Sequence, residues 1–202
     1  MPKVKNFKDI LDSSFRWPQK NDLPFSEAKN PGNNAKIADR DFTRLVLMIG
    51  GYKKAADLMV ERTVNDWRER DFLVYPIIFN YRHFLELSLK YQLATYGPRV
   101  GVEPNWESHD LKILWPEFRR VLDQFGIDDP DGADKNVERI VFNFANIDPM
   151  SFSHRYPVNK KGNPLDVKQE KLDLVNLADV MQATKGYFDG CDGYLDELVS
   201  AQ

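Results

Sequence analysis

The sequence predicts an all-α protein: a bundle of four to five helices with an irregular N-terminal arm and a short loop or hairpin insertion before the last helix. Apolar residues recur at helical spacing over most of residues 39–202, and clusters of Pro and Gly separate these stretches. No internal repeat or low-complexity tract interrupts them. The chain has 202 residues, of which 42% are hydrophobic, so we expect a single helical-bundle domain at 39–202 with one sizeable core.

Residues 1–38 are expected to form an extended arm, because Pro18, Pro24 and Pro31 forbid a long helix. The arm carries seven basic and four acidic residues, a charge of +3, within a chain whose net charge is −3. That net charge excludes a strongly basic nucleic-acid coat. The single cysteine, Cys191, excludes an internal disulfide and a zinc site built on paired cysteines. No other cluster of metal ligands is visible in the sequence, and we expect neither a metal nor a cofactor.

Capping and helix-breaking residues delimit the expected helices. These helices cover 39–70 (one long helix or a helix pair), 71–96, 109–125, 133–146 and 167–198. Asp71 and Ser108 are the predicted N-caps of the second and third helices. Gly50 and Gly51 predict a kink or close packing in the first helix. Three glycines, Gly186, Gly190 and Gly193, predict the same in the last one.

Residues 147–167 contain three prolines and Gly162, so this insertion is not expected to be helical, and 159–162 can turn a short hairpin. No stretch approaches the ~18 apolar residues needed to cross a bilayer. No apolar segment follows the charged N-terminus as in a signal peptide. We therefore expect a soluble, cytoplasmic protein with no membrane partner.

A polar stripe runs along the second helix, where Arg82, His83, Glu86 and Lys90 share one narrow face. Glu86 can pair with Arg82 and Lys90, each four residues away. His83 can reach Glu86, which would raise the basicity of the imidazole. The stripe is expected either in a groove, where it can bind phosphate or act as a general base, or on the solvent edge as an ion-paired face. Spacing alone favours the solvated face.

Two further polar segments contain the other histidines. Ser108-His109-Asp110 stands at a helix start, which favours capping over a ligand site. In the insertion, His154, Arg155 and Tyr156 are adjacent, and an arginine in such a loop suits a planar anion or a nucleotide. The alternative is an arginine that locks the loop onto the bundle. The candidate ligand-binding residues are Arg82, His83, Glu86, Lys90, His109, Arg155 and Tyr156, and the candidate catalytic residues are His83, His154 and Arg155.

Five segments taken together resemble a known family. They are 51–60 (GYKKAADLMV), 73–79 (LVYPIIF), 81–90 (YRHFLELSLK), 108–115 (SHDLKILW) and 148–157 (DPMSFSHRYP). In this order they resemble uncharacterised bacterial proteins of the HEPN helical-bundle superfamily, over roughly residues 45–185. The resemblance implies a four- to five-helix bundle that is usually a homodimer. It also implies, for many members, a metal-independent ribonuclease of toxin–antitoxin or phage-defence systems.

The nuclease motif of that family is absent from this sequence. It consists of an Arg followed, after four to six residues, by a His. No Arg stands at that distance before His83, His109 or His154. The departure argues against the usual activity and leaves the function open.

Three functional hypotheses follow. The first is a non-catalytic binding or regulatory module in stress response or phage defence, which binds a nucleotide or an RNA backbone and has a protein partner encoded nearby. The second is a noncanonical ribonuclease, with His83 or His154 as general base and Arg155 stabilising the phosphorane. The third is a structural dimer whose polar stripe only fixes helix register. A cleft shared by His83 and Arg155 would favour a site, and a stripe satisfied inside the bundle would favour structure.

Overall fold

The computed structural model describes residues 16–147, 158, 161–164 and 170–201, and it divides into two units, Met1–Ile37 and Ala38–Gln202. In the first unit the described residues contain one short 3-10 helix, η1 (Pro31–Asn33). The side chain of Asn30 accepts a hydrogen bond from the backbone N–H of Gly32 and so caps its start. The described part of the arm therefore has no long helix, as its prolines predict.

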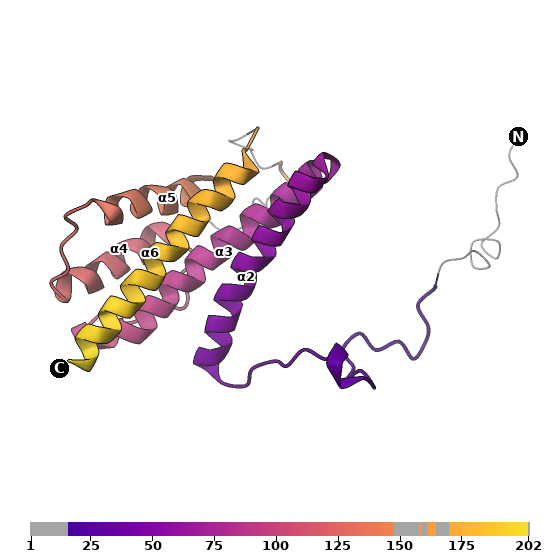
Figure 1. Cartoon of the computed structure of the whole chain (residues 1–202), viewed down its shortest axis with the longest axis horizontal. Helices are drawn as coiled ribbons and strands as arrows, with labels where there is room; N and C mark the ends of the chain where they lie inside the picture. Colours follow the sequence, from indigo (N-terminus) through magenta and orange to yellow (C-terminus); the bar gives the residue numbers. More distant parts are fainter. Residues whose placement is uncertain (1–15, 148–157, 159–160, 165–169, 202) are drawn as a thin grey trace, which may run out of the picture. The chain divides into compact units, whose positions relative to one another are not determined.

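The described part of the second unit is all-α, which confirms the predicted class (Figure 1). Its helices are α2 (Asp41–Asn65), α3 (Arg70–Tyr96), α4 (Leu111–Gln124), α5 (Ala133–Ile147) and α6 (Leu174–Ser200), with short 3-10 helices η2 (Trp67–Glu69) and η3 (Gly97–Val100). In the predicted hairpin, an isolated antiparallel bridge joins Val158 and Pro164, and the described residues form no strand.

Helix α3 is the central helix of the bundle. It packs against α2, α4 and α6, while α5 covers α4 and α6. Fourteen of its residues are buried, on nearly every side of the helix. Aromatic rings from three helices complete the core: Phe84 of α3, Trp115 and Phe118 of α4, and Phe188 of α6, with the Phe118 and Phe188 ring centres 6.1 Å apart. A helix surrounded in this way buries the polar residues that fall on its covered sides.

Four of the five helix starts differ from the prediction, three by one or two residues and that of α6 by seven. Helix α4 begins at Leu111 rather than 109, because the carboxylate of Asp110 accepts the N–H of Lys112 at 2.8 Å and is the N-cap. Ser108 lies two residues earlier, and its hydroxyl accepts a hydrogen bond from the N–H of Asp110. Helix α3 begins at Arg70, so Asp71 lies in its first turn instead of capping it. Helix α6 begins at Leu174, where Asp173 caps two N–H groups.

The predicted close packing at Gly50 and Gly51 is wrong. Helix α2 runs from Asp41 to Asn65 without interruption, and no neighbouring atom lies within 4 Å of where a Cβ would stand at either glycine. The same holds for the three glycines of α6. The close approach occurs instead at Gly97, where a Cβ would lie 2.3 Å from the carbonyl oxygen of Val102. Gly97 therefore lets the chain fold back tightly after α3.

Candidate functional site: a buried polar network on α3

Three of the four residues of the polar stripe on α3 are buried in the bundle, and His83 is half-buried. Glu86 accepts hydrogen bonds from Arg82 (Nη1 to Oε2, 3.2 Å) and from Lys90 (Nζ to Oε1, 3.0 Å). The side chains of Arg82, Glu86 and Lys90 are 0%, 2% and 5% exposed. The predicted ion pairs therefore form, but the predicted location in a groove or on the solvent edge is wrong. The helix has too few uncovered sides to expose them.

The segment that covers the stripe is the loop between α3 and α4, residues 97–110, which we call the strap. Arg82 donates to the carbonyl oxygen of His109 at 2.7 Å, and Lys90 donates to that of Trp106 at 3.0 Å. Nδ1 of His109 lies 2.8 Å from Oε1 of Glu86. Two buried cations thus fasten the strap to α3 through its backbone, and one carboxylate fastens it through a side chain.

The charges in the network fit these contacts. Arg82 and Lys90 bring two positive charges and Glu86 one negative charge, and the two carbonyl oxygens take up further donors of the cations. Burial would raise the pKa of Glu86, but hydrogen bonds from Lys90 and His109 outweigh it and lower that pKa below its ordinary value. Within the described residues, these three side chains contain no buried nitrogen or oxygen without a hydrogen-bond partner. The arrangement is therefore suited to holding the strap rather than to binding an external anion.

His83 lies on α3 beside the network but packs among aromatic rings. Its ring centre is 4.4 Å from that of Tyr52 in an edge-on arrangement and 5.7 Å from that of Phe79, on which it stacks. Partial burial lowers the pKa of His83, and the attraction of Glu86 only partly offsets this effect. The predicted increase in basicity is therefore wrong, since the nearby cations also disfavour the imidazolium.

The remaining candidates divide into one placed residue and three that are not described. His109 is 60% exposed and contacts Glu86 from the surface. His154, Arg155 and Tyr156 lie outside the described residues. A cleft shared by His83 and Arg155 therefore stays a prediction.

A second buried polar cluster was not predicted from the sequence. Lys53 of α2, whose side chain is 4% exposed, donates to both carboxylate oxygens of Asp57 (2.9 and 2.7 Å) and to Oε1 of Gln182 on α6 (3.0 Å). The hydroxyl of Tyr81 on α3 donates to Asp57 at 2.8 Å. The four-residue spacing of Lys53 and Asp57 was the available signal. Nothing in the sequence places Tyr81 or Gln182 beside them.

A third cluster, also unpredicted, joins the last three helices. Asp134 of α5 accepts a hydrogen bond from the hydroxyl of Tyr187 on α6 at 2.6 Å and pairs with Arg119 of α4. Trp115 of α4 donates to Glu138 of α5 at 3.1 Å. These contacts connect α4, α5 and α6 through side chains of the bundle itself.

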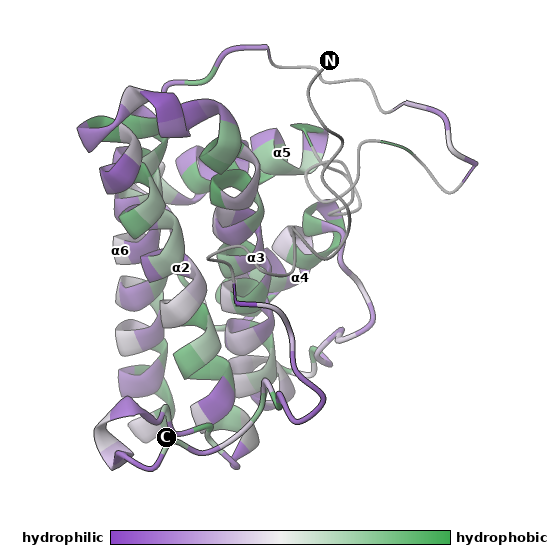
Figure 2. Cartoon of the chain, turned by 90° about the vertical axis from the view of Figure 1, so that its right-hand side faces the viewer, coloured by the Kyte–Doolittle hydropathy of each residue, from purple (hydrophilic) through white to green (hydrophobic). Residues whose placement is uncertain are grey.

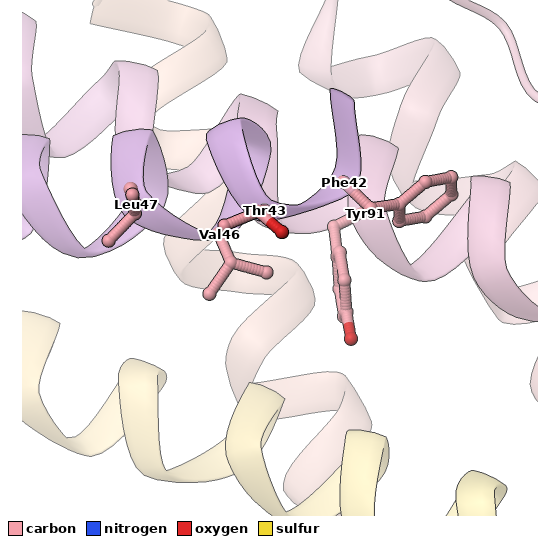
Figure 3. A pocket seen from close by; sticks show the side chains of 5 residues that line it. All are labelled: Phe42, Thr43, Val46, Leu47 and Tyr91. Carbon is pink, nitrogen blue, oxygen red and sulfur yellow. The ribbon is translucent and has the colours of Figure 1, made fainter. Parts of the chain in front are cut away.

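The surface hollows lie elsewhere, at the N-terminal half of α2. Phe42, Thr43, Val46, Leu47 and Tyr91 line the first, a shallow hollow of about 350 Å³ that we call the α2 hollow (Figure 3). On the other side of α2, a second hollow of about 520 Å³ is lined by Phe42, Arg44, Leu45, Met48, Leu87 and Trp106. Figure 1 shows why this region is open, since the N-terminal end of α2 stands apart from the C-terminal ends of α3 and α6.

Large apolar side chains are exposed around these hollows. Phe42, Val46 and Leu47 are 52%, 50% and 58% exposed, and Trp106 of the strap is 51% exposed. Single exposed apolar residues are ordinary, whereas a group on one region marks a site of interaction. The sequence did not indicate this region, because the same helical spacing is expected for residues that face a core.

Metal ligands and membrane-spanning helices are also absent from the described part of the chain. There, no group of three or more His, Cys, Asp or Glu side chains is arranged to hold a metal ion. None of the described helices combines the length and apolar character needed to cross a membrane.

Comparisons of the chain with protein-family models, with curated proteins and with solved structures give no significant match. The HEPN-type resemblance accordingly stays a prediction.

Proposed function

We propose that this chain is a non-catalytic binding module whose α2 hollow takes an amphipathic helix of a protein partner. The observation that carries the proposal is a contrast within the described residues. The cations of α3 that would attract a nucleotide are buried and bonded to the chain's own Glu86 and strap, whereas large apolar side chains stand exposed beside an open hollow. Helix-in-groove recognition uses this kind of apolar surface.

The charge beside the hollow indicates which helix would fit. Tyr91 of α3 contributes its ring to the hollow, and Figure 3 shows this ring beside Phe42 of α2. Burial raises the pKa of the Tyr91 hydroxyl, and the carboxylates of Asp192 and Asp196 on α6 raise it further. These carboxylates act on Tyr91 without lining the hollow, and we place an acidic flank at this edge of it. The proposed partner helix is therefore apolar on one face and basic beside it.

A designed peptide tests this proposal without knowledge of the natural partner. The probe is a synthetic helix of about 15 residues with leucines at i, i+3, i+4 and i+7 and lysines elsewhere, followed by fluorescence anisotropy. We expect Val46→Lys to weaken its binding by roughly tenfold or more, because a lysine would lie in the apolar hollow. Val175→Lys on α6 is the matched control, since Val175 is 58% exposed but does not line the hollow. Equal affinity for both variants would overturn the proposal, as would stronger binding of a peptide with glutamates in place of the lysines.

Other parts of the expected function are proposals with tests of their own. RNA or nucleotide binding, and the noncanonical ribonuclease, are tested by incubating the chain with total cellular RNA beside an Arg155→Ala, His83→Ala double variant. Absence of cleavage in both would exclude the nuclease, and equal RNA binding by both would exclude a site built on these residues. A homodimer, as the resemblance implies, belongs to the proposal and is tested by sedimentation. A role in stress response or phage defence and a partner encoded nearby stay predictions.

A further inference from the structure

The outward face of α2 carries a regular pattern of its own. Six exposed positions recur at alternating steps of three and four residues, namely Arg44, Leu47, Gly51, Lys54, Leu58 and Glu61. Steps of three and four keep these residues on one side of the helix, as the a and d positions of a helix pair are, and they span about 26 Å. Two of the six, Leu47 and Leu58, are apolar. The opposite face of α2 carries Ala56 and Val60 into the core. The outward face therefore has nothing to pack against within the described part of the bundle.

The pattern is self-complementary when two copies of the helix run antiparallel. We place the two-fold axis of the pair between Tyr52 and Lys53. Each residue then faces the residue of the other copy that lies equally far on the opposite side of this midpoint. Leu47 then faces Leu58 of the other copy, and Arg44 faces Glu61. Because a two-fold axis repeats every contact, two leucine pairs and two opposite-charge pairs form at once.

The remaining pair of facing positions in this register involves Gly51. In this register it faces Lys54 of the other copy, and no atom of its own bundle lies within 4 Å of where its Cβ would be. The absent side chain leaves room for the aliphatic stem of a lysine, whose ammonium group then reaches solvent. Gly51, for which the sequence predicted close packing within the bundle, thus has space for Lys54 of the other copy instead.

Charge also selects the direction of pairing. A parallel pair would place Arg44, Lys54 and Glu61 each opposite its own copy, so all three charged layers would be repulsive. The antiparallel pair turns two of these residues into attractive partners. Figure 2 shows apolar and polar residues alternating along the ribbon of α2.

We propose that two copies of this chain associate through the outward faces of α2, antiparallel, with Arg44 of each copy paired to Glu61 of the other and Leu47 to Leu58. This interface specifies the homodimer of the proposed function and rests on it. It shares Leu47 with the α2 hollow, whereas neither Leu58 nor Glu61 lines that hollow, so variants at these two residues leave the peptide site intact.

Charge exchange in the full chain tests the proposal. By sedimentation over a wide range of concentrations, we expect wild type to dimerise and Glu61→Arg to weaken the dimer by roughly tenfold or more, because arginine would then face Arg44. Arg44→Glu should do the same, and the double variant Arg44→Glu, Glu61→Arg should regain the dimer. Glu197→Arg on the exposed face of α6 is the matched control and should leave association unchanged.

Cross-linking tests the direction. A mixture of Leu47→Cys and Leu58→Cys chains should form a disulfide between the two variants, whereas neither variant alone should cross-link at that position. Self-linked Leu58→Cys would overturn the antiparallel register. A dimer that persists in Glu61→Arg would overturn the interface, and a wild-type chain that stays monomeric would overturn the pairing altogether. Peptide binding by such a monomer would leave the α2 hollow as proposed, so the two failures are distinguishable.

Discussion

Nδ1 of His109 lies 2.8 Å from Oε1 of Glu86, so a side chain that is 60% exposed touches one that is 2% exposed. The same carboxylate holds two buried cations, and those cations hold the backbone of the strap. Glu86 is thus the group through which α3, its two cations and the strap depend on one another.

Replacing Glu86 by Gln should destabilise the protein strongly. Glutamine keeps the shape of the side chain but leaves Arg82 and Lys90 buried without a counter-charge, which costs about 3–5 kcal/mol. Urea unfolding measures the loss. Glu197→Gln makes the same chemical change on the exposed face of α6 and should stay within about 0.5 kcal/mol of wild type. A small effect of Glu86→Gln would contradict the proposed dependence of the strap on this carboxylate.

Stability should fall with acidification in two separate ranges. The pKa of His83 is lowered in the fold, so its contribution is complete above the unfolded pKa of about 6.5 and is lost as the pH falls through the lower folded value. The pKa of Glu86 is lowered as well, so its contribution is complete above about 4.3 and is lost below that.

The two ranges can be assigned by substitution. Unfolding free energies measured between neutral and acidic pH should lose the upper range in His83→Phe, whose ring suits the aromatic contacts with Tyr52 and Phe79. The lower range should remain in that variant and disappear in Glu86→Gln. An unchanged upper range in His83→Phe would show that another group titrates there.

The sequence was sufficient to predict local features, but not to predict which helix faces other parts of the chain cover. Helical spacing and breaking residues predicted the class and the approximate extent of each helix, because both act within a few residues. The ion pairs of Glu86 with Arg82 and Lys90 were predictable for the same reason. Their burial was not, because it depends on the strap, whose path follows from the close approach of Gly97 to Val102.

Contacts between distant helices could not be predicted from the sequence for a related reason. Lys53 meets Gln182 across 129 residues, and a buried lysine has the same local signature as an exposed one. Conversely, Phe42 and Val46 follow the spacing of core residues but stand exposed, since α2 diverges from its neighbours there. Both features depend on which side of a helix another element covers.

The adjacent lysines of α2 provide a test of this difference. Lys53→Ala removes the buried ammonium from Asp57 and Gln182 and should cost about 2 kcal/mol, less than Glu86→Gln because Asp57 is 41% exposed and stays solvated. Lys54→Ala removes an exposed lysine and should change the unfolding free energy by less than about 0.5 kcal/mol. Thermal or urea unfolding of both variants, at concentrations where wild type is monomeric, measures the difference. Equal effects would contradict the burial of Lys53.

Two glycine substitutions should change the free energy of unfolding in opposite directions. Gly50 lies within α2, is exposed and has no atom within 4 Å of its Cβ position, so Gly50→Ala should stabilise the protein by about 0.5–1 kcal/mol through helix propensity. Gly97 has ordinary helical backbone angles, but a Cβ there would meet the carbonyl oxygen of Val102 at 2.3 Å. Gly97→Ala must therefore displace backbone at the start of the strap and should cost about 1–3 kcal/mol.

The two glycine substitutions act on stability in different ways, so amide exchange should also distinguish them. Helix propensity acts on α2 alone, so Gly50→Ala should raise stability without altering amide exchange in the strap. Displacement at Gly97 moves the loop that Arg82 and Lys90 hold, so Gly97→Ala should speed amide exchange across residues 97–110 even below the unfolding transition. A Gly97→Ala variant as stable as wild type, with unchanged exchange in the strap, would mean that the chain folds back after α3 by another path. The way in which the strap covers the buried network would then need another explanation.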